Sequence, residues 1–264
     1  MKERCDCEGE FYYMTVSDPL SRIRVVLSHP THPGNIGAAA RAMKTMGLSQ
    51  LYLVRPKRFP DPEARARSAN ALDVLERATV CEDLGEALRG TALAFAVSAR
   101  TRELAHAPLD ARSAAAEAVA CARREDVAFL FGNETTGLSN DEVLACNRLA
   151  CIPANPDYSS LNLASAVQVI AYECRISALG AEPAPARPGA PAAVLAPHED
   201  VEKFFAHLEQ SLQASGFLDP ANPRRLRERI RRLFLRVTLE AEEVSLLRGM
   251  LSAWDKPRTR GKDS

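Results

Sequence analysis

The sequence has no net charge, because its 264 residues include 34 Lys and Arg and 34 Asp and Glu. Overall charge therefore gives no argument for nucleic-acid binding, and any such argument must come from local basic patches. The chain also lacks an apolar run near the roughly 20 residues of a membrane span. Residues 1–13 do not resemble a signal peptide. We expect a soluble, cytoplasmic protein.

Two nucleotide-binding motifs are missing as well. No Gly-x-Gly-x-x-Gly follows the first expected strand, and Gly-x-x-x-x-Gly-Lys occurs nowhere. These absences argue against the dinucleotide-binding and P-loop versions of an α/β fold. A ligand of this protein must be held in another way.

A disulfide framework and a metal site are also not indicated. The seven cysteines are an odd number, and most lie in apolar runs, as expected for small buried side chains in a reducing compartment. Neither Cys5 with Cys7 nor His29 with His32 has a second pair at a spacing that suits zinc. We therefore expect no metal.

What the chain does contain is an alternation of short apolar runs and helical patterns, with 46% hydrophobic residues. We expect strands at residues 23–27, 51–54, 92–97, 127–131 and 149–152, and helices at residues 36–46, 65–77, 113–123, from 139 onward, and 161–179. This order predicts an α/β fold with a mainly parallel sheet of about five or six strands.

Two polar loops follow the last two of these strands. Gly132–Gly137 comes after the strand at 127–131, and Pro153–Ser160 comes after the strand at 149–152. Ser139 and Glu142 form a capping box at the helix that follows the first loop. In parallel sheets ligands bind outside the carboxyl ends of the strands. Alternatively, these loops could be only tight connections between a strand and a helix. The presence of two such loops in one short stretch favours a binding site.

The first expected helix carries a glycine and an arginine on one face. Asn35 is expected as its N-cap and Gly47 as its C-terminal glycine. Gly37 and Arg41 are four residues apart, so the missing side chain of Gly37 would leave open space beside the stem of Arg41. A glycine in a helix lowers helix stability by about 1 kcal/mol relative to alanine. A group that packs closely against that face would explain why glycine is present. Arg41 could equally be an ordinary solvated arginine.

Local basic segments give the only charge-based argument for nucleic acid. The loop Arg55–Pro60 includes Lys57 and Arg58 and could contact phosphates, although such runs are more often simply solvated. Arg100 and Arg102 lie in the loop after the strand at 92–97.

The domain organisation follows from composition. We expect an extension at residues 1–20, a main domain at 21–180, a Pro/Ala-rich linker at 181–198, a helical domain at 199–256 and a tail at 257–264. Three helices are expected in the helical domain, at residues 199–215, 223–236 and 241–254. The middle one has an apolar stripe of Leu226, Ile230, Leu233 and Phe234 and a basic face suited to phosphates. That face could instead serve solubility or dimer contacts.

Together, three blocks of sequence resemble the SPOUT class of RNA methyltransferases. The first holds Asn35, Gly37 and Arg41, the second is Phe131–Glu134 with Gly137 and Leu138, and the third is Ile152 and Pro153 with Ser159–Leu163. The stretch NPDYSSLNLASAVQVIAYE and residues 248–251 (RGML) look like the TrmJ group within this class. The resemblance covers about residues 23–251.

The resemblance implies a fold that patterns alone would not suggest. It adds to the parallel sheet a deep trefoil knot near the carboxyl end of the main domain and a small helical extension. Knots are very rare because chains almost never thread their own loops, so only the resemblance suggests one here. The knotted pocket would bind S-adenosylmethionine, and the resemblance assigns these residues to it: Val97, Ser98, Ala99, Gly132, Ile152, Ser159, Ser160 and Leu161. Relatives often have threonine in place of Val97. A homodimer is also implied, with the partner chain completing the RNA site.

The implied activity is methylation of the ribose 2′-hydroxyl of cytidine or uridine at position 32 of the tRNA anticodon loop. Residues expected at the RNA are Arg41, Arg55, Lys57, Arg58, Arg100 and Arg102. Two alternatives stay open: a 2′-O-methyltransferase of ribosomal RNA, and an RNA-binding protein of the same fold that has lost the chemistry.

In this chemistry Arg41, Ser160 and Asn35 are the expected catalytic residues. A guanidinium with a pKa above about 12 is a poor base, so we expect Arg41 to hold the target phosphate and stabilise the developing alkoxide. Ser160 would place the ribose, and Asn35 would position Arg41 and the substrate. Glu134, with Asn133 and Gly137, is expected to brace the loops rather than to abstract the proton.

Overall fold

The computed structural model describes residues 18–99, 107–180, 194–221, 223 and 225–256. Within these residues seven strands form one sheet in the order β3-β2-β1-β6-β4-β7-β5, and each neighbouring pair is parallel. The strands are β1 (Ile23–Ser28), β2 (Gln50–Val54), β3 (Thr79–Cys81), β4 (Thr91–Val97), β5 (Leu109–Asp110), β6 (Asp126–Phe131) and β7 (Arg148–Cys151). The predicted α/β class and parallel sheet are confirmed. The two strands that were not predicted, β3 and β5, are short and lie at the edges.

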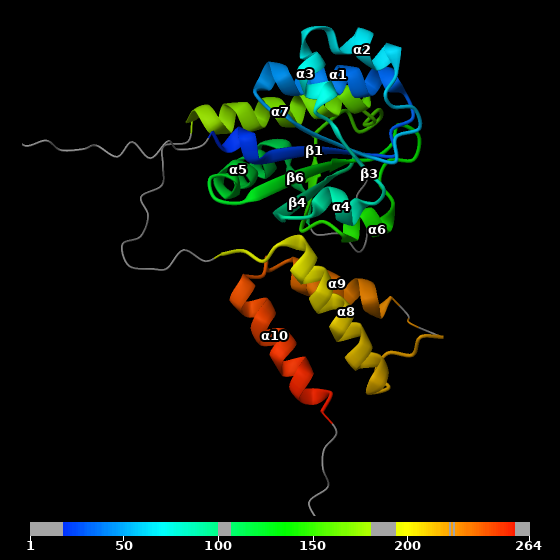
Figure 1. Cartoon of the computed structure of the whole chain (residues 1–264), viewed down its shortest axis with the longest axis vertical. Coiled ribbons are helices and arrows are strands. Elements are labelled where there is room, and N and C mark those ends of the chain that lie inside the picture. Colours follow the sequence, from blue (N-terminus) through cyan, green and yellow to red (C-terminus); the bar gives the residue numbers. More distant parts are fainter. Residues whose placement is uncertain (1–17, 100–106, 181–193, 222, 224, 257–264) are drawn as a thin grey trace, which may run out of the picture.

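Helices cover both faces of the sheet (Figure 1). On one face lie α1 (Pro33–Met46), α5 (Ala111–Ala122) and α7 (Leu163–Gly180), which share one apolar core with the sheet. On the other face lie the short helices α4 (Leu84–Leu88) and α6 (Asn140–Leu144). Because both faces are covered, the central strands are mostly apolar, and the exceptions include Arg24 and Ser28 in β1. The rings of Phe95 and Phe129 stack at 4.8 Å between centroids on neighbouring strands.

The helix predicted at 65–77 is broken into three pieces. They are α2 (Pro62–Ser68), a 3-10 turn η2 (Ala69–Ala71) and α3 (Leu72–Glu76); a further 3-10 turn, η1 (Pro19–Arg22), precedes β1. The break follows from Ala69, whose φ of 47° is not helical. The prediction of a single helix was therefore wrong, because the periodic pattern continues through the turn.

Gly37 lies where α2 crosses α1. A Cβ on Gly37 would lie 2.1 Å from the carbonyl oxygen of Ala64 and 2.9 Å from its carbonyl carbon. The expectation of open space at Gly37 beside Arg41 was wrong, because the backbone of α2 fills it. Close approach of two helices is the physical reason for a glycine here.

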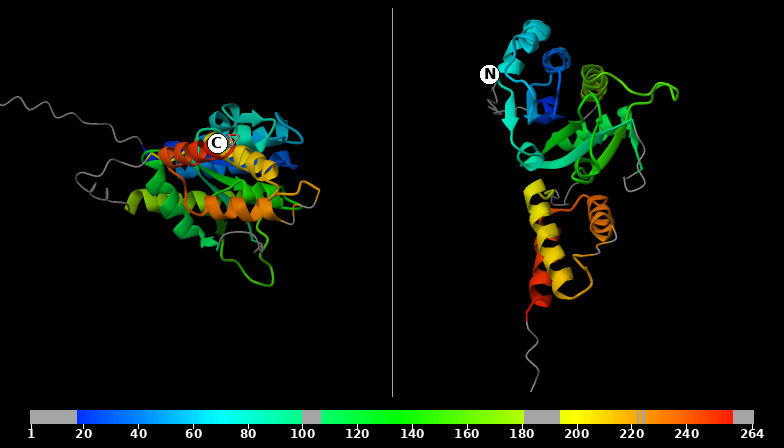
Figure 2. Two further views of the ribbon diagram at one scale, coloured as in Figure 1. Left: turned by 90° about the horizontal axis from the view of Figure 1, so that it is seen from below. Right: turned by 90° about the vertical axis from the view of Figure 1, so that its right-hand side faces the viewer.

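The C-terminal residues form a separate helical region below α4 and α6 (Figures 1 and 2). It consists of α8 (His198–Ala214), α9 (Leu226–Leu235) and α10 (Ala241–Trp254). Its core contains Phe204 and Phe205, on which the ring of Phe234 packs edge-on. The apolar stripe predicted for α9 is wrong at Leu233, which is 53% exposed, because Leu235 is the side chain that turns inward.

Residues 194–197, at the end of the predicted linker, pack against this helical region. Leu195 forms an isolated bridge with Glu240, and Ala196 is buried. Residues 1–17 of the extension predicted at 1–20, most of the linker (181–193) and the tail (257–264) lie outside the described residues. The last residue of that predicted extension, Leu20, is buried in the core. In the described part of the chain, no helix combines the length and apolar character that crossing a membrane requires.

Candidate active site

A pocket of about 310 Å³ lies at the carboxyl ends of β4, β6 and β7. Its walls are the residues that follow each strand and the start of α7. They include every residue predicted to contact the methyl donor: Val97, Ser98, Ala99, Gly132, Ile152, Ser159, Ser160 and Leu161. The structure thus brings together residues that are distant in sequence, and their binding of a donor stays a prediction.

The loop after β6 is a closed turn that requires glycine. A Cβ on Gly132 would lie 2.2 Å from the carbonyl carbon of Gly137, which itself has a φ of 69°. The side-chain oxygen of Asn133 accepts hydrogen bonds from the N–H groups of Thr135 and Thr136, at 2.9 and 2.7 Å. These contacts fix the turn that forms one wall of the pocket.

Glu134 connects this loop to the start of α1. Its carboxylate accepts hydrogen bonds from the N–H and hydroxyl of Thr31 at 2.9 and 2.7 Å, from the N–H of His32 at 3.2 Å and from Asn35 Nδ2 at 2.9 Å. Burial raises the pKa of Glu134, but the hydrogen bonds from Asn35 and Thr31 outweigh it and lower this pKa to about 2. At neutral pH Glu134 is a carboxylate that is fully engaged in bracing.

Asn35 is not the N-cap that was predicted. Helix α1 begins at Pro33 with His32 at the N-cap, because proline is well suited to the first turn. Asn35 instead donates to Glu134, and its oxygen accepts a hydrogen bond from Asn162 Nδ2 at 3.0 Å. The predicted glycine at the end of this helix is confirmed: Gly47 has a φ of 89°.

Asn162 belongs to the block Ser159–Leu163 that carries the resemblance, but no role was predicted for it. Its oxygen accepts the N–H of Ala164 at 2.9 Å at the start of α7, while its amide reaches Asn35. The chain Glu134–Asn35–Asn162 therefore links the loop after β6, the start of α1 and the start of α7. The helix was predicted to begin at residue 161, which placed Asn162 inside it, whereas α7 begins at Leu163 and leaves Asn162 where asparagine often caps.

Arg41 lies outside the pocket. It is exposed on α1, is not part of the pocket wall, and its side chain has no hydrogen bond or ion pair with the residues that the structure describes. Within one chain the predicted catalytic arginine and the predicted donor pocket are therefore separate. Ser160 does line the pocket.

The predicted RNA-binding residues differ in their surroundings. Arg55, Lys57 and Arg58 are all exposed, and Arg58 lies 3.9 Å from both Asp61 and Glu63. Arg100 and Arg102 lie outside the described residues.

The basic face of α9 is partly neutralised by α8. Arg227 pairs with Glu209 at 2.5 Å, and Arg231 pairs with Glu202 and lies over the ring of Phe205. Fewer cations of α9 are thus available to phosphates than the sequence suggested.

The cysteines of the described part of the chain are free thiols. Cys81, Cys146 and Cys174 are buried, and Cys121 and Cys151 are half-buried. Among the described residues no three His, Cys, Asp or Glu side chains are grouped so that they could share a metal ion.

Comparison with known proteins identifies this arrangement. Residues 22–172 match the model of the SpoU rRNA Methylase family, and residues 199–264 match that of the tRNA methyltransferase TrmJ C-terminal domain. The tRNA (cytidine/uridine-2′-O-)-methyltransferase TrmJ of Yersinia pestis (strain Pestoides F) is 46% identical over 241 residues, covering 90% of this chain and 93% of the relative.

Solved structures agree. The crystal structure of TrmJ from Z. mobilis ZM4 matches with a TM-score of 0.77 at 32% identity, over 88% of this chain and 99% of the other. The SpoU methyltransferase AviRb from Streptomyces viridochromogenes, solved in complex with the cofactor AdoMet, matches with a TM-score of 0.50 at 26% identity, over 60% of this chain and 58% of the other.

The fold and pocket thus define a SpoU-type RNA methylase. More narrowly, the chain belongs to the TrmJ family of tRNA (cytidine/uridine-2′-O-)-methyltransferases.

Proposed function

We propose that the chain transfers a methyl group from S-adenosylmethionine to the ribose 2′-hydroxyl of cytidine or uridine at position 32 of the tRNA anticodon loop, in the cytoplasm. The observation that carries this proposal is the pocket at the ends of β4, β6 and β7, whose wall includes every residue predicted to contact the donor. Relatives named for this type of reaction at 46% identity support the choice of substrate.

The pocket suits the donor in size and character. Its volume of about 310 Å³ falls within the roughly 300–1,000 Å³ of small-molecule sites. Apolar surface for the adenine base comes from Val97, Leu138, Ile152 and Leu161. The loop Gly132–Gly137 also lines the pocket. The donor, when bound, supplies a methyl group on a sulfonium that is already a good leaving group.

The residues of the chain then have to align the donor with the ribose and stabilise the charge that develops on the ribose oxygen. The pocket walls fix the donor so that the ribose oxygen, the methyl carbon and the sulfur can lie in line at near-attack distance. Ser160 places the ribose. Glu134 is held by four donors with a pKa of about 2, so it is too weak a base to take the hydroxyl proton, and we assign it to bracing the loops.

Arg41 is assigned to the target phosphate and to the alkoxide that develops on the ribose. Since Arg41 lies outside the pocket of its own chain, the proposal includes a homodimer in which α1 of one protomer completes the RNA site of its partner. Helix α7, which packs beside α1, offers an exposed apolar stripe for such contact: Tyr172, Ile176 and Leu179 are 48, 45 and 70% exposed. A stripe of this kind on a helix typically marks an interaction surface.

The proposal also includes the deep trefoil knot of the SPOUT class, formed by the backbone between Gly132 and Leu161. The sheet order supports it: β7, late in the chain, is inserted between the earlier strands β4 and β5, and the loops after β6 and β7 both face the pocket.

The test is transfer of labelled methyl from S-adenosylmethionine to tRNA. We expect Arg41→Ala to lose most turnover while donor binding, measured by calorimetry, stays unchanged. Arg77→Ala is the matched control, because Arg77 is exposed and precedes β3 at the amino end of the sheet, away from the pocket. Full activity of Arg41→Ala would contradict its assigned role.

Mapping of 2′-O-methylated nucleotides in cells lacking the protein tests the substrate. Loss of methylation at position 32 of tRNA is expected. Loss confined to ribosomal RNA, or to another tRNA position, would overturn the assignment of the target. Absence of any donor binding would favour an RNA-binding protein that has lost the chemistry.

A further inference from the structure

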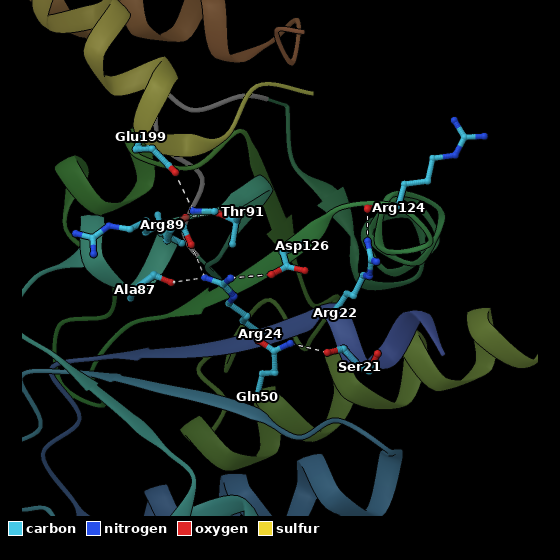
Figure 3. Close-up of polar contacts among 12 residues, drawn as sticks. Ser21, Arg22, Arg24, Gln50, Ala87, Arg89, Thr91, Arg124, Asp126 and Glu199 are labelled. Carbon is cyan, nitrogen blue, oxygen red and sulfur yellow. Dashed lines mark hydrogen bonds and ion pairs between the residues drawn. The ribbon is translucent and has the colours of Figure 1, made fainter. Parts of the chain in front are cut away.

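The strands that form the pocket are held at their opposite, amino ends by a polar network. Figure 3 shows Arg24, from β1, at its centre. The guanidinium of Arg24 pairs with Asp126, the first residue of β6, at 2.8 Å, and donates to the carbonyl oxygen of Arg89 at 2.7 Å. The side chain of Arg24 is only 10% exposed, and these partners replace part of the water that it loses on folding, while its buried Nε has no partner among the described residues. Arg24 therefore fixes the start of β6 relative to the turn that leads into β4.

That turn is also held by the helical region. The N–H of Gly90, the residue before β4, donates to the Glu199 carboxylate of α8 at 2.9 Å (Figure 3). Burial raises the pKa of Glu199, but the hydrogen bonds from the N–H groups of Gly90 and of Glu199 itself, together with His198, lower this pKa overall. The contact thus favours the charged carboxylate, which makes the stronger hydrogen bond.

A second contact holds β7. Arg148 is the first residue of this strand, and its guanidinium donates to Thr238 Oγ1 at 3.0 Å, just beyond the end of α9. The same guanidinium is fixed by Glu117 of α5 at 2.9 Å. Its side chain is 22% exposed, so loss of the Thr238 hydroxyl would remove one acceptor from a poorly solvated guanidinium, which keeps Glu117 and the carbonyl oxygen of Leu235.

We propose that Glu199, Arg148 and Thr238 are positioning residues, through which docking of the helical region sets the geometry of the donor pocket. The inference rests on the proposed function, because it takes the pocket to bind S-adenosylmethionine. It assigns to the helical region an influence on the methyl donor, at the far end of the sheet.

The short path from Arg148 to the pocket explains how docking of the helical region can affect donor binding. β7 has four residues, and Ile152 in the pocket wall follows its last one directly. At about 3.3 Å per residue the path is roughly 13 Å. β4 and β7 pair with each other from Phe95 with Arg148 to Val97 with Ala150, so a shift at the start of either strand moves the pocket wall at its end.

The first test measures donor affinity in the full-length chain. We expect Glu199→Ala and Thr238→Val each to weaken the binding of S-adenosylmethionine by about two- to thirtyfold, the range over which residues between two sites modulate their coupling. Glu199→Gln, which keeps an acceptor, should fall between wild type and Glu199→Ala.

Two variants serve as controls. Glu242→Ala removes a glutamate from the first turn of α10, matching the position of Glu199 in α8, and Thr79→Val makes the same change as Thr238→Val on the exposed edge strand β3. Neither should change donor affinity.

The second test uses the reciprocity of coupling: if docking favours donor binding, donor binding must favour docking. Saturating S-adenosylmethionine should slow hydrogen exchange of the Gly90 amide in the wild type and should do so less in Glu199→Ala. Donor binding also stabilises the whole fold and slows exchange of every amide that opens only by global unfolding. The diagnostic result is therefore a slowing at Gly90 that exceeds the slowing at Gln50, the first residue of β2.

The outcomes separate the two proposals. Wild-type affinity for the donor in both Glu199→Ala and Thr238→Val, or a donor-induced slowing at Gly90 no greater than that at Gln50, would overturn the coupling while leaving the proposed function intact. No donor binding by the wild type would instead overturn the proposed function.

Discussion

Replacing Glu134 by glutamine tests whether the carboxylate braces the loops around the pocket. Its two oxygens accept four hydrogen bonds, and a glutamine would direct its NH₂ group at donors that now meet an oxygen. We expect the Glu134→Gln variant to fold with the same architecture but with a lower free energy of unfolding at pH 7.

The size of the effect follows from the pKa of Glu134. Folding lowers it from 4.5 to about 2, and each unit corresponds to about 1.4 kcal/mol. With allowance for partial solvent screening, the carboxylate contributes about 2–3 kcal/mol at pH 7. Because the folded-state pKa is depressed, this stability is present above pH 4.5 and is lost as the pH falls toward 2. The deficit of Glu134→Gln should therefore shrink over that range.

Urea unfolding at pH 7, 4 and 3 measures the difference. Far-UV circular dichroism is the suitable signal, since the single tryptophan, Trp254, reports only on α10. Glu242→Gln, at an exposed position, is the control and should match the wild type. Equal stability of Glu134→Gln and wild type at pH 7 would refute the reasoning. A loss of unfolding free energy in Glu134→Gln that stays the same at pH 3 would show that it comes from the altered hydrogen-bond geometry rather than from the lost charge.

Two further predictions concern packing and the thiols. Gly37→Ala should lower the free energy of unfolding by about 1–3 kcal/mol, because the new Cβ meets the backbone of α2; Gly249→Ala in α10, where nothing lies within 4 Å, should instead gain up to about 1 kcal/mol. Urea unfolding checks both, and a more stable Gly37→Ala variant would contradict the close packing of α1 and α2. Burial raises the pKa of the Cys174 thiol to about 12 and also raises that of Cys146, so neither should react with a thiol reagent in the folded protein at pH 8. Peptide mass mapping would detect labelling, and rapid modification of either would disprove their burial.

The sequence predicted the central sheet and the pocket better than the connections around them. Long apolar runs such as Val127–Phe131 identify buried strands, since both faces of a parallel sheet are covered. The edge strands β3 and β5 have three and two residues, too few for any periodic signal. The contact between Gly37 and Ala64 could not be predicted from the sequence, because it depends on where α2 crosses α1.

Site residues divide in the same way. The residues of the pocket wall follow strands that the pattern identified, so topology places them together. Asn35 donates a hydrogen bond to Glu134 and accepts one from Asn162, which joins the start of α1 to two separate loops, and no spacing along the chain encodes these contacts. The position of Arg41 outside its own pocket likewise depends on the direction in which α1 leaves the sheet.

The order of strands also constrains how the chain can be made. β1 pairs with β6, residue Ile23 opposite Val127, so a strand completed early in synthesis waits for roughly a hundred further residues before its second neighbour emerges from the ribosome. Such distant pairing slows folding and leaves an apolar strand edge open in the meantime. The two halves of this sheet are therefore interleaved, and the amino-terminal half gains its central neighbour only after β6 has been made.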